Sequence, residues 1–105
     1  MVNIIRNSSN VDFDVPYTVY IDNVEIFKIV NRETRSVDIK EGKHTIQVKS
    51  SKYKSNIIDF EIYENQNIDF TVEPDYQNNA ISKFFTNTLY GKLGIKITKT
   101  NDFYL

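Results

Sequence analysis

The sequence contains no cysteine, and it has only three glycines and two prolines among 105 residues. The absence of cysteine excludes a disulfide framework, a thiolate metal site and a cysteine nucleophile, and it is typical of a reducing compartment. Three glycines leave little material for a phosphate-binding loop. No apolar run approaches the ~20 residues that a membrane-spanning helix needs, and the first residues show no apolar signal segment. We therefore expect a cytoplasmic protein.

Neither sign of charge is in clear excess. The chain carries 13 basic and 14 acidic residues, a net charge of −1, so the composition shows no electrostatic footprint for DNA or RNA. Seven phenylalanines and seven tyrosines can fill a packed core and argue against disorder. The abundance of Ile, Asn and Lys is typical of AT-rich bacterial or phage genomes.

A chain of this length buries roughly two thirds of its unfolded surface, which is enough for one core without covalent cross-links. The length predicts a single domain over residues 1–105. We place the body of the domain at residues 1–73, and a helix-like segment followed by a closing strand at residues 74–105.

Apolar and polar residues alternate with a period of two along much of the chain, a pattern typical of half-buried strands. The clearest example is residues 36–50, where two alternating runs flank Glu41 and Gly42. This pattern predicts a hairpin whose tight turn uses the conformational freedom of the glycine.

A second hairpin is predicted to join strands 17–21 and 24–30 through Asp22 and Asn23, which tolerate left-handed turn dihedrals. Strand 24–30 is apolar on both faces, which is typical of a strand that is central or pressed against another element.

A third hairpin is predicted between strands 56–63 and 67–73. Its expected inward residues are Ile58, Phe60, Ile62, Ile68, Phe70 and Val72, and its outward residues include Asp59, Glu61, Asn67, Asp69, Thr71 and Glu73. Short strands at residues 2–6 and around Leu93, Ile95 and Ile97 complete the pattern. Regularly spaced strands with turns between them predict an all-β fold, an Ig-like or PEGA-like antiparallel β-sandwich of about seven or eight strands.

Pro74 marks a change of pattern, and a short helix or irregular segment is expected after it. Ile81, Phe84, Phe85 and Leu89 follow spacings of three and four, which places them on one helical face. This apolar stripe either packs on the sandwich or is exposed for a protein partner or a membrane surface.

Four segments resemble a PEGA-type β-sandwich repeat: V-Y-I-D-N-V (19–24), I-K-E-G-K-H-T-I-Q-V-K (39–49), K-S-N-I-I-D-F-E-I (54–62) and F-T-V (70–72). Such repeats carry a V-x-I-D-G hairpin followed by G-x-H-x-I-x-V. The chain is also similar to small bacterial proteins with an I-I-R start and a G-K-H-T-I hairpin. The likeness covers roughly residues 1–73.

The resemblance implies a fold and supplies no catalytic residues. Asn23 stands where the repeat usually has glycine, an exchange that the turn tolerates, and the P-E-G-A tetrapeptide itself is absent.

Few residues suggest chemistry. His44 is the only histidine, and no partner stands at metal-binding or catalytic spacing around it, so we expect a structural role. Asp12 and Asp14 form a D-x-D pair without the further oxygen ligands and the glycine of a calcium loop. We expect no catalytic residue, no cofactor and no metal, and we do not expect an enzyme.

Lys52, Tyr53 and Lys54 form a basic loop, extended by Lys43 and Lys49. Basic residues beside an aromatic ring can contact a phosphate backbone and stack on a base, although a solvated surface is the commoner role of such a loop.

The leading hypothesis is a non-catalytic protein-interaction or structural module of a bacterium or phage. Its partner would bind at the apolar stripe, or a partner strand or a second copy would pair with a sheet edge such as 24–30. The alternatives are a peripheral membrane protein that uses residues 81–89, and a small nucleic-acid-binding or metal-binding protein. Neither is favoured.

Overall fold

The computed structural model describes residues 1–9, 11–75 and 92–104, and within them every regular element is a β-strand. The strands are β1 (Val2–Arg6), β2 (Tyr17–Ile21), β3 (Val24–Ile29), β4 (Thr34–Val37), β5 (Gly42–Lys49), β6 (Tyr53–Ser55), β7 (Ile58–Ile62), β8 (Gln66–Pro74) and β9 (Lys92–Tyr104). The all-β prediction is confirmed. The helix predicted around Ile81, Phe84, Phe85 and Leu89 lies outside the described residues.

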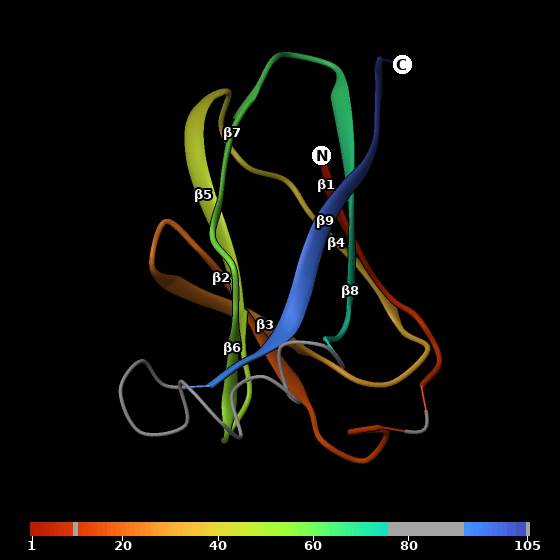
Figure 1. Ribbon diagram of the computed structural model, residues 1–105. Helices are drawn as coiled ribbons and strands as arrows, with labels where there is room; N and C mark the ends of the chain where they lie inside the picture. Colours follow the sequence, from red (N-terminus) through yellow and green to blue (C-terminus); the bar gives the residue numbers. More distant parts are fainter. Residues whose placement is uncertain (10, 76–91, 105) are drawn as a thin grey trace.

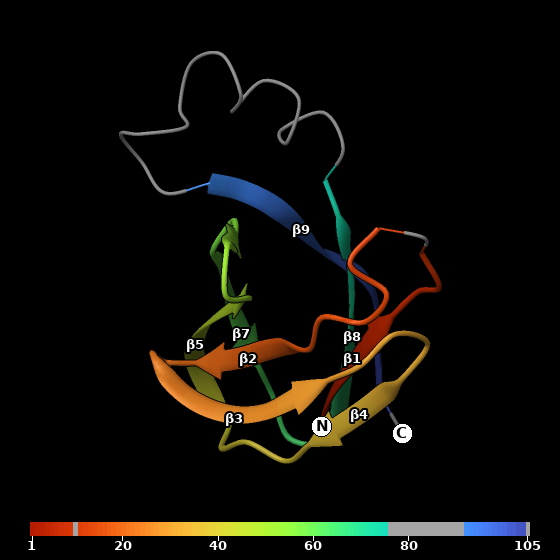
Figure 2. The same ribbon diagram turned by 90° about the horizontal axis from the view of Figure 1, so that it is seen from below.

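All nine described strands belong to one sheet, in the order β3-β2-β5-β6-β9-β8-β1-β4, with β7 also paired to β5. Figure 2 shows that the sheet curls, so that β3 at one end comes near β4 at the other. Arg35 of β4 donates a hydrogen bond from Nη1 to the carbonyl of Lys28 on β3, at 3.2 Å. The sheet is therefore nearly closed into a barrel, and the two-sheet Ig-like or PEGA-like arrangement stays a prediction.

The hairpin of β2 and β3 is confirmed. Its two strands pair antiparallel from Ile21 opposite Val24 to Tyr17 opposite Ile29. The turn residues Asp22 and Asn23 have φ values of 53° and 64°, the left-handed values that a two-residue turn between twisted strands requires.

The hairpin predicted at Glu41 and Gly42 is wrong. β4 pairs with β1, and β5 pairs with β2, β6 and β7, so the two runs on either side of the glycine are not partners. The connection 38–41 carries the chain across the end of the barrel. Gly42 has a φ of 128°, a conformation that glycine adopts without a Cβ clash, and here it redirects the chain instead of closing a hairpin.

The third predicted hairpin is also wrong in its pairing, although its buried face is largely right. β7 pairs with β5, whereas β8 lies between β1 and β9. The bend between them is tight, because the N–H of Gln66 donates to the carbonyl of Tyr63 at 3.1 Å. It carries the chain from one wall of the barrel to the other, as the green bend at the top of Figure 1 shows.

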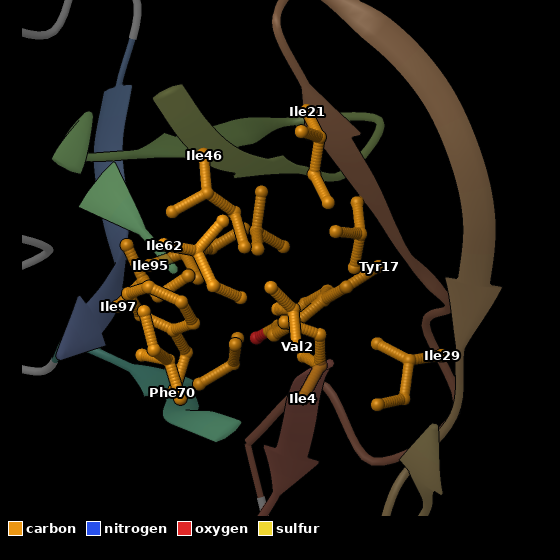
Figure 3. Packing of buried hydrophobic residues seen from close by; sticks show 14 residues of the cluster. Val2, Ile4, Tyr17, Ile21, Ile29, Ile46, Ile62, Phe70, Ile95 and Ile97 are labelled. Carbon is orange, nitrogen blue, oxygen red and sulfur yellow. The ribbon is translucent and has the colours of Figure 1, made fainter. Parts of the chain in front are cut away.

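The core lies between the walls of the curled sheet, and Figure 3 shows its side chains converging from opposite walls. Its members are Val2, Ile4, Tyr17, Val19, Ile21, Ile29, Ile46, Val48, Ile62, Ile68, Phe70, Val72, Ile95 and Ile97. Burial of each large apolar side chain contributes roughly 1.5–3 kcal/mol, so the core is the main stabilising feature of this fold.

Arg6 lies at the end of β1 and is only 2% exposed. Its Nη1 donates to the carbonyls of Val15 and Ile29 at 2.7 and 3.0 Å, and its Nη2 donates to the carbonyl of Asp12 at 2.6 Å. The guanidinium also lies 3.7 Å from the centre of the Tyr17 ring. Desolvation lowers the pKa of Arg6 below its usual value. The side chain thus joins three segments at this end of the barrel.

Candidate functional site

The opposite end of the barrel is formed by the connection 38–41, the bend between β7 and β8, and the residue before β1. Both connections lie at the top of Figure 1. They surround a cavity of about 580 Å³, which we call the mouth. Its apolar lining comes from Met1, Ile39 and Ile62, of which Ile62 belongs to the core. The mouth is therefore an opening whose base reaches the hydrophobic core.

Three carboxylates line the mouth. Asp38 and Glu41 come from the connection 38–41 and Glu64 comes from the β7–β8 bend, and all three are exposed. The ammonium group of Met1 also lies here and donates to the carbonyl of Gln66 at 2.7 Å. Three carboxylates and one ammonium leave an excess of two negative charges. Charge of one sign around a cavity with apolar walls produces a focused potential, which here favours cations.

Asn67 also lines the mouth, and it differs from the sequence expectation. The alternation of β8 predicts that Asn67 faces solvent, but the residue is only 7% exposed. Within the described part of the chain, its side-chain amide makes no hydrogen bond. A buried amide without a partner costs roughly 1–3 kcal/mol, and this cost disappears when a ligand supplies the partner.

Aromatic side chains lie beside the mouth. Tyr63 of the β7–β8 bend is 52% exposed and Tyr104 of β9 is 61% exposed. The register of β8 and β9 places Tyr104 opposite Gln66, and Phe103 opposite Asn67. A hydrogen bond to Glu61 raises the pKa of Tyr63. These rings provide faces on which a cation or a flat group can pack.

His44 lies on β5 next to the mouth. Its Nδ1 is 2.6 Å from Oδ2 of Asp22, and its Nε2 is 2.6 Å from the carbonyl of Lys40. The other oxygen of Asp22 accepts the N–H of Thr45 at 2.9 Å. Both ring nitrogens face acceptors, which suits an imidazolium that donates twice.

The hydrogen bond between His44 and Asp22 shifts the pKa of both residues. The hydrogen bond to Asp22 raises the pKa of His44, and the hydrogen bond to His44 lowers the pKa of Asp22. His44 therefore ties the β2–β3 turn to the connection 38–41, which carries two of the mouth carboxylates. This geometry favours the structural interpretation of His44.

The predicted basic loop is partly a strand. Tyr53 and Lys54 belong to β6, and Tyr53 packs against the core. Lys52 precedes the strand and is exposed. Lys54 lies opposite Lys49 of β5, so the structure keeps these lysines together on the outer face of the sheet and turns the tyrosine ring inward.

The predicted sheet edge is an end of the sheet, as strand β3 has a hydrogen-bonded neighbour on one side only. Its register shifts between Val19 and Tyr20 of β2, which leaves Ile26 as an extra residue on β3. This bulge explains why β3 has apolar residues on both faces. A bulge, together with the bond from Arg35 to Lys28, hinders addition of a further strand.

The remaining predicted sites are quickly placed. Asp12 lies in the turn before β2, where its carboxylate accepts a hydrogen bond from the hydroxyl of Tyr17 at 3.1 Å.

Among residues 1–9, 11–75 and 92–104, no group of three or more acidic or histidine side chains is arranged to hold a metal ion. Within the same residues, no helix is long and apolar enough to cross a membrane. The stripe Ile81, Phe84, Phe85 and Leu89 lies outside these residues.

The mouth was not predicted from the sequence. Its carboxylates occur in two turns that are far apart in the chain, and charged turn residues are common on any surface. Both turns connect strands that pair with other strands and not with each other. This feature could have indicated the mouth, but it is visible only once the strand pairing is known. Comparison of the chain with protein-family models, with curated proteins and with solved structures finds no match.

Proposed function

We propose that this protein is a non-catalytic protein-interaction module whose mouth binds a basic segment of a partner protein. The observation that carries the proposal is a cavity lined by three carboxylates and by Asn67, whose buried amide has no hydrogen-bond partner among the described residues. A lysine or arginine side chain supplies the N–H donors that the Asn67 amide and the carboxylates accept.

The shape of the mouth supports the same occupant. The aliphatic stem of a lysine or arginine is apolar and can lie on Ile39 and Ile62 while its charged group reaches the carboxylates. The exposed ring of Tyr63 offers a face for a guanidinium. Charged groups at an exposed rim are screened by salt, so we expect weak binding that weakens further as salt increases.

We also propose that the curled sheet is a PEGA-like variant that functions in the cytoplasm of a bacterium or phage-infected cell. The hairpin at Asp22 and Asn23, which stands in the V-Y-I-D-N-V segment, supports the fold part of this proposal.

The test is fluorescence anisotropy with a labelled hexa-arginine peptide in about 50 mM salt, where surface charges are screened less than at physiological ionic strength. We expect saturable binding that Glu41→Gln/Glu64→Gln weakens by about tenfold, the loss of roughly 1.4 kcal/mol. Asn67→Leu, which fills the space without an acceptor, should weaken binding as well.

The matched control is Asp14→Asn/Glu25→Gln, which removes two exposed carboxylates that do not line the mouth. This variant has the same change in net charge and should bind as the wild type does. Equal weakening by both pairs would show that the peptide responds to net charge alone, and the proposed site would be abandoned.

A further inference from the structure

A second charged feature lies at the end of the molecule opposite the mouth. The turn between β5 and β6 is held by two short bonds, from the N–H of Ser50 to the carbonyl of Tyr53 at 2.7 Å and from the N–H of Tyr53 to Oγ of Ser50 at 3.0 Å. Lys49, Lys52 and Lys54 surround this turn. We call these three lysines and the turn they flank the basic tip.

Among the described residues, the lysines of the basic tip have no acidic partner. Lys49 and Lys54 are directly opposite each other on neighbouring strands, a like-charge pair that destabilises a sheet. In the described part of the chain no carboxylate forms an ion pair with any of the three. The ammonium of Lys49 instead lies 4.7 Å from the centre of the Tyr20 ring. The pairing thus brings together positive charges that an acidic surface would stabilise.

The basic tip and the mouth cannot meet within one molecule. Strand β5 begins at Gly42 beside the mouth and ends at Lys49 in the basic tip, a separation of about 25 Å at the usual rise per residue. Figure 1 shows the β5–β6 turn at the bottom of the view and the mouth at the top. The two features therefore lie toward opposite ends of a molecule that is 44 Å long.

We propose that the basic tip of one copy docks into the mouth of a second copy, so that the chains associate head to tail. This inference rests on the proposed function of the mouth and names its partner. Three ammonium groups beside the β5–β6 turn meet three carboxylates around an opening, and Asn67 receives an N–H donor. The net charge of −1 does not reveal this separation of charge, because the charges at the two ends nearly cancel each other.

The contact is heterologous, since it joins two different surfaces. Each added copy presents a free mouth and a free basic tip, so the association continues into chains unless the rotation closes a ring. Contacts between exposed charges are weak and salt-sensitive, so the assemblies grow with protein concentration and dissociate at high salt.

Sedimentation velocity on the full chain tests this, with two variants that each neutralise one surface. Glu41→Gln/Glu64→Gln alters the mouth, and Lys49→Gln/Lys52→Gln alters the basic tip. In about 50 mM salt the wild type should sediment faster as its concentration rises, and about 500 mM salt should abolish this increase. Each variant alone should remain a monomer.

An equimolar mixture of the two variants is the decisive sample. One variant retains its basic tip and the other retains its mouth, so the mixture should form a species of two chains and nothing larger. Circular dichroism checks that both variants are folded. Lys96→Gln/Lys99→Gln removes two exposed lysines of β9 that belong to neither the mouth nor the basic tip and should associate as the wild type does.

A wild type that stays monomeric in low salt, or a mixture that shows no two-chain species, would overturn the head-to-tail inference. If hexa-arginine still binds the mouth in that case, the proposed function stands and only the identity of the partner is wrong. If hexa-arginine does not bind either, both are wrong.

Discussion

Arg6 is the residue that most directly fixes the arrangement at its end of the barrel. A buried arginine is tolerated only when its charge is well solvated by protein groups, and here three carbonyls and the face of Tyr17 provide that environment. The same bonds join the turn 12–15 and the end of β3 to β1, in addition to the backbone bond from the N–H of Val15 to the carbonyl of Asp12 at 3.0 Å. One side chain therefore contacts every segment that the three carbonyls belong to.

We predict that Arg6→Met lowers the free energy of unfolding by about 3 kcal/mol, because three carbonyls lose the hydrogen bonds that the buried guanidinium donates. Methionine retains much of the volume of the stem, so the loss reports mainly on the hydrogen bonds. Urea unfolding measures the change.

The control for this prediction is Arg35→Met. Arg35 also donates to a carbonyl and lies 4.7 Å from an aromatic ring centre, that of Phe27, but it is exposed. We expect a loss of at most about 1 kcal/mol there. Equal losses at the two arginines would show that burial does not set the cost.

Asn67 shows where prediction from residues alone fails. The alternation of apolar and polar residues places Asn67 on the face of β8 that would be exposed to solvent if the strand were isolated. The structure nevertheless buries it where it lines the mouth with Met1 and Tyr63, whereas Asp69, Thr71 and Glu73 on the same face of β8 stay partly exposed. Alternation tells which face a side chain is on, but the groups that pack over that face decide whether it is exposed.

At the scale of elements, the turns show which strand connections can be predicted from the sequence and which cannot. Asp22 and Asn23 form a two-residue turn that needs left-handed dihedrals at both positions, and both residue types favour them, so the hairpin was predictable. Gly42 signals a positive φ just as clearly. A positive φ can close a hairpin or redirect a chain, and only long-range pairing distinguishes the two.

The link between the β2–β3 turn and the connection 38–41 gives a pH dependence. The folded-state pKa of His44 is raised above 6.5, so its stabilising contribution is complete below that value and is lost as pH rises through the folded pKa. The pKa of Asp22 is lowered below 3.8, so its contribution is present above that value and is lost as pH falls through the lowered pKa.

We therefore predict that His44→Gln costs about 1 kcal/mol near pH 5.5 and clearly less near pH 9, a modest effect because Asp22 is half exposed. Urea unfolding of the wild type and of His44→Gln at the two pH values measures this cost. The difference between the two proteins at each pH cancels the contribution of other titrating groups. Asp22→Asn should remove the same pH dependence. A cost that does not change with pH would show that His44 is neutral in the folded state.

For the whole molecule, the strand order predicts a gradient of local stability. β1 and β8 have hydrogen-bonded neighbours on both sides, and their inward side chains are buried, whereas β3 and β4 are the two ends of the sheet. Amides exchange with solvent through local opening, which is easiest where pairing is one-sided. We predict the slowest hydrogen exchange in β1 and β8 and the fastest strand exchange in β3 and β4. Uniform exchange across all four strands would contradict the strand order.

The position of β1 has a consequence for how the chain reaches this structure during synthesis. Asn3 of β1 donates to Asp69 of β8 at 2.8 Å, across 66 residues of sequence. β1 leaves the ribosome before β8, the strand that pairs beside it in parallel. Closure of so long a loop is entropically costly, and folds dominated by distant pairings typically fold in milliseconds to seconds. β1 therefore stays unpaired with β8 until β8 has also been synthesised, and the barrel cannot close before that point.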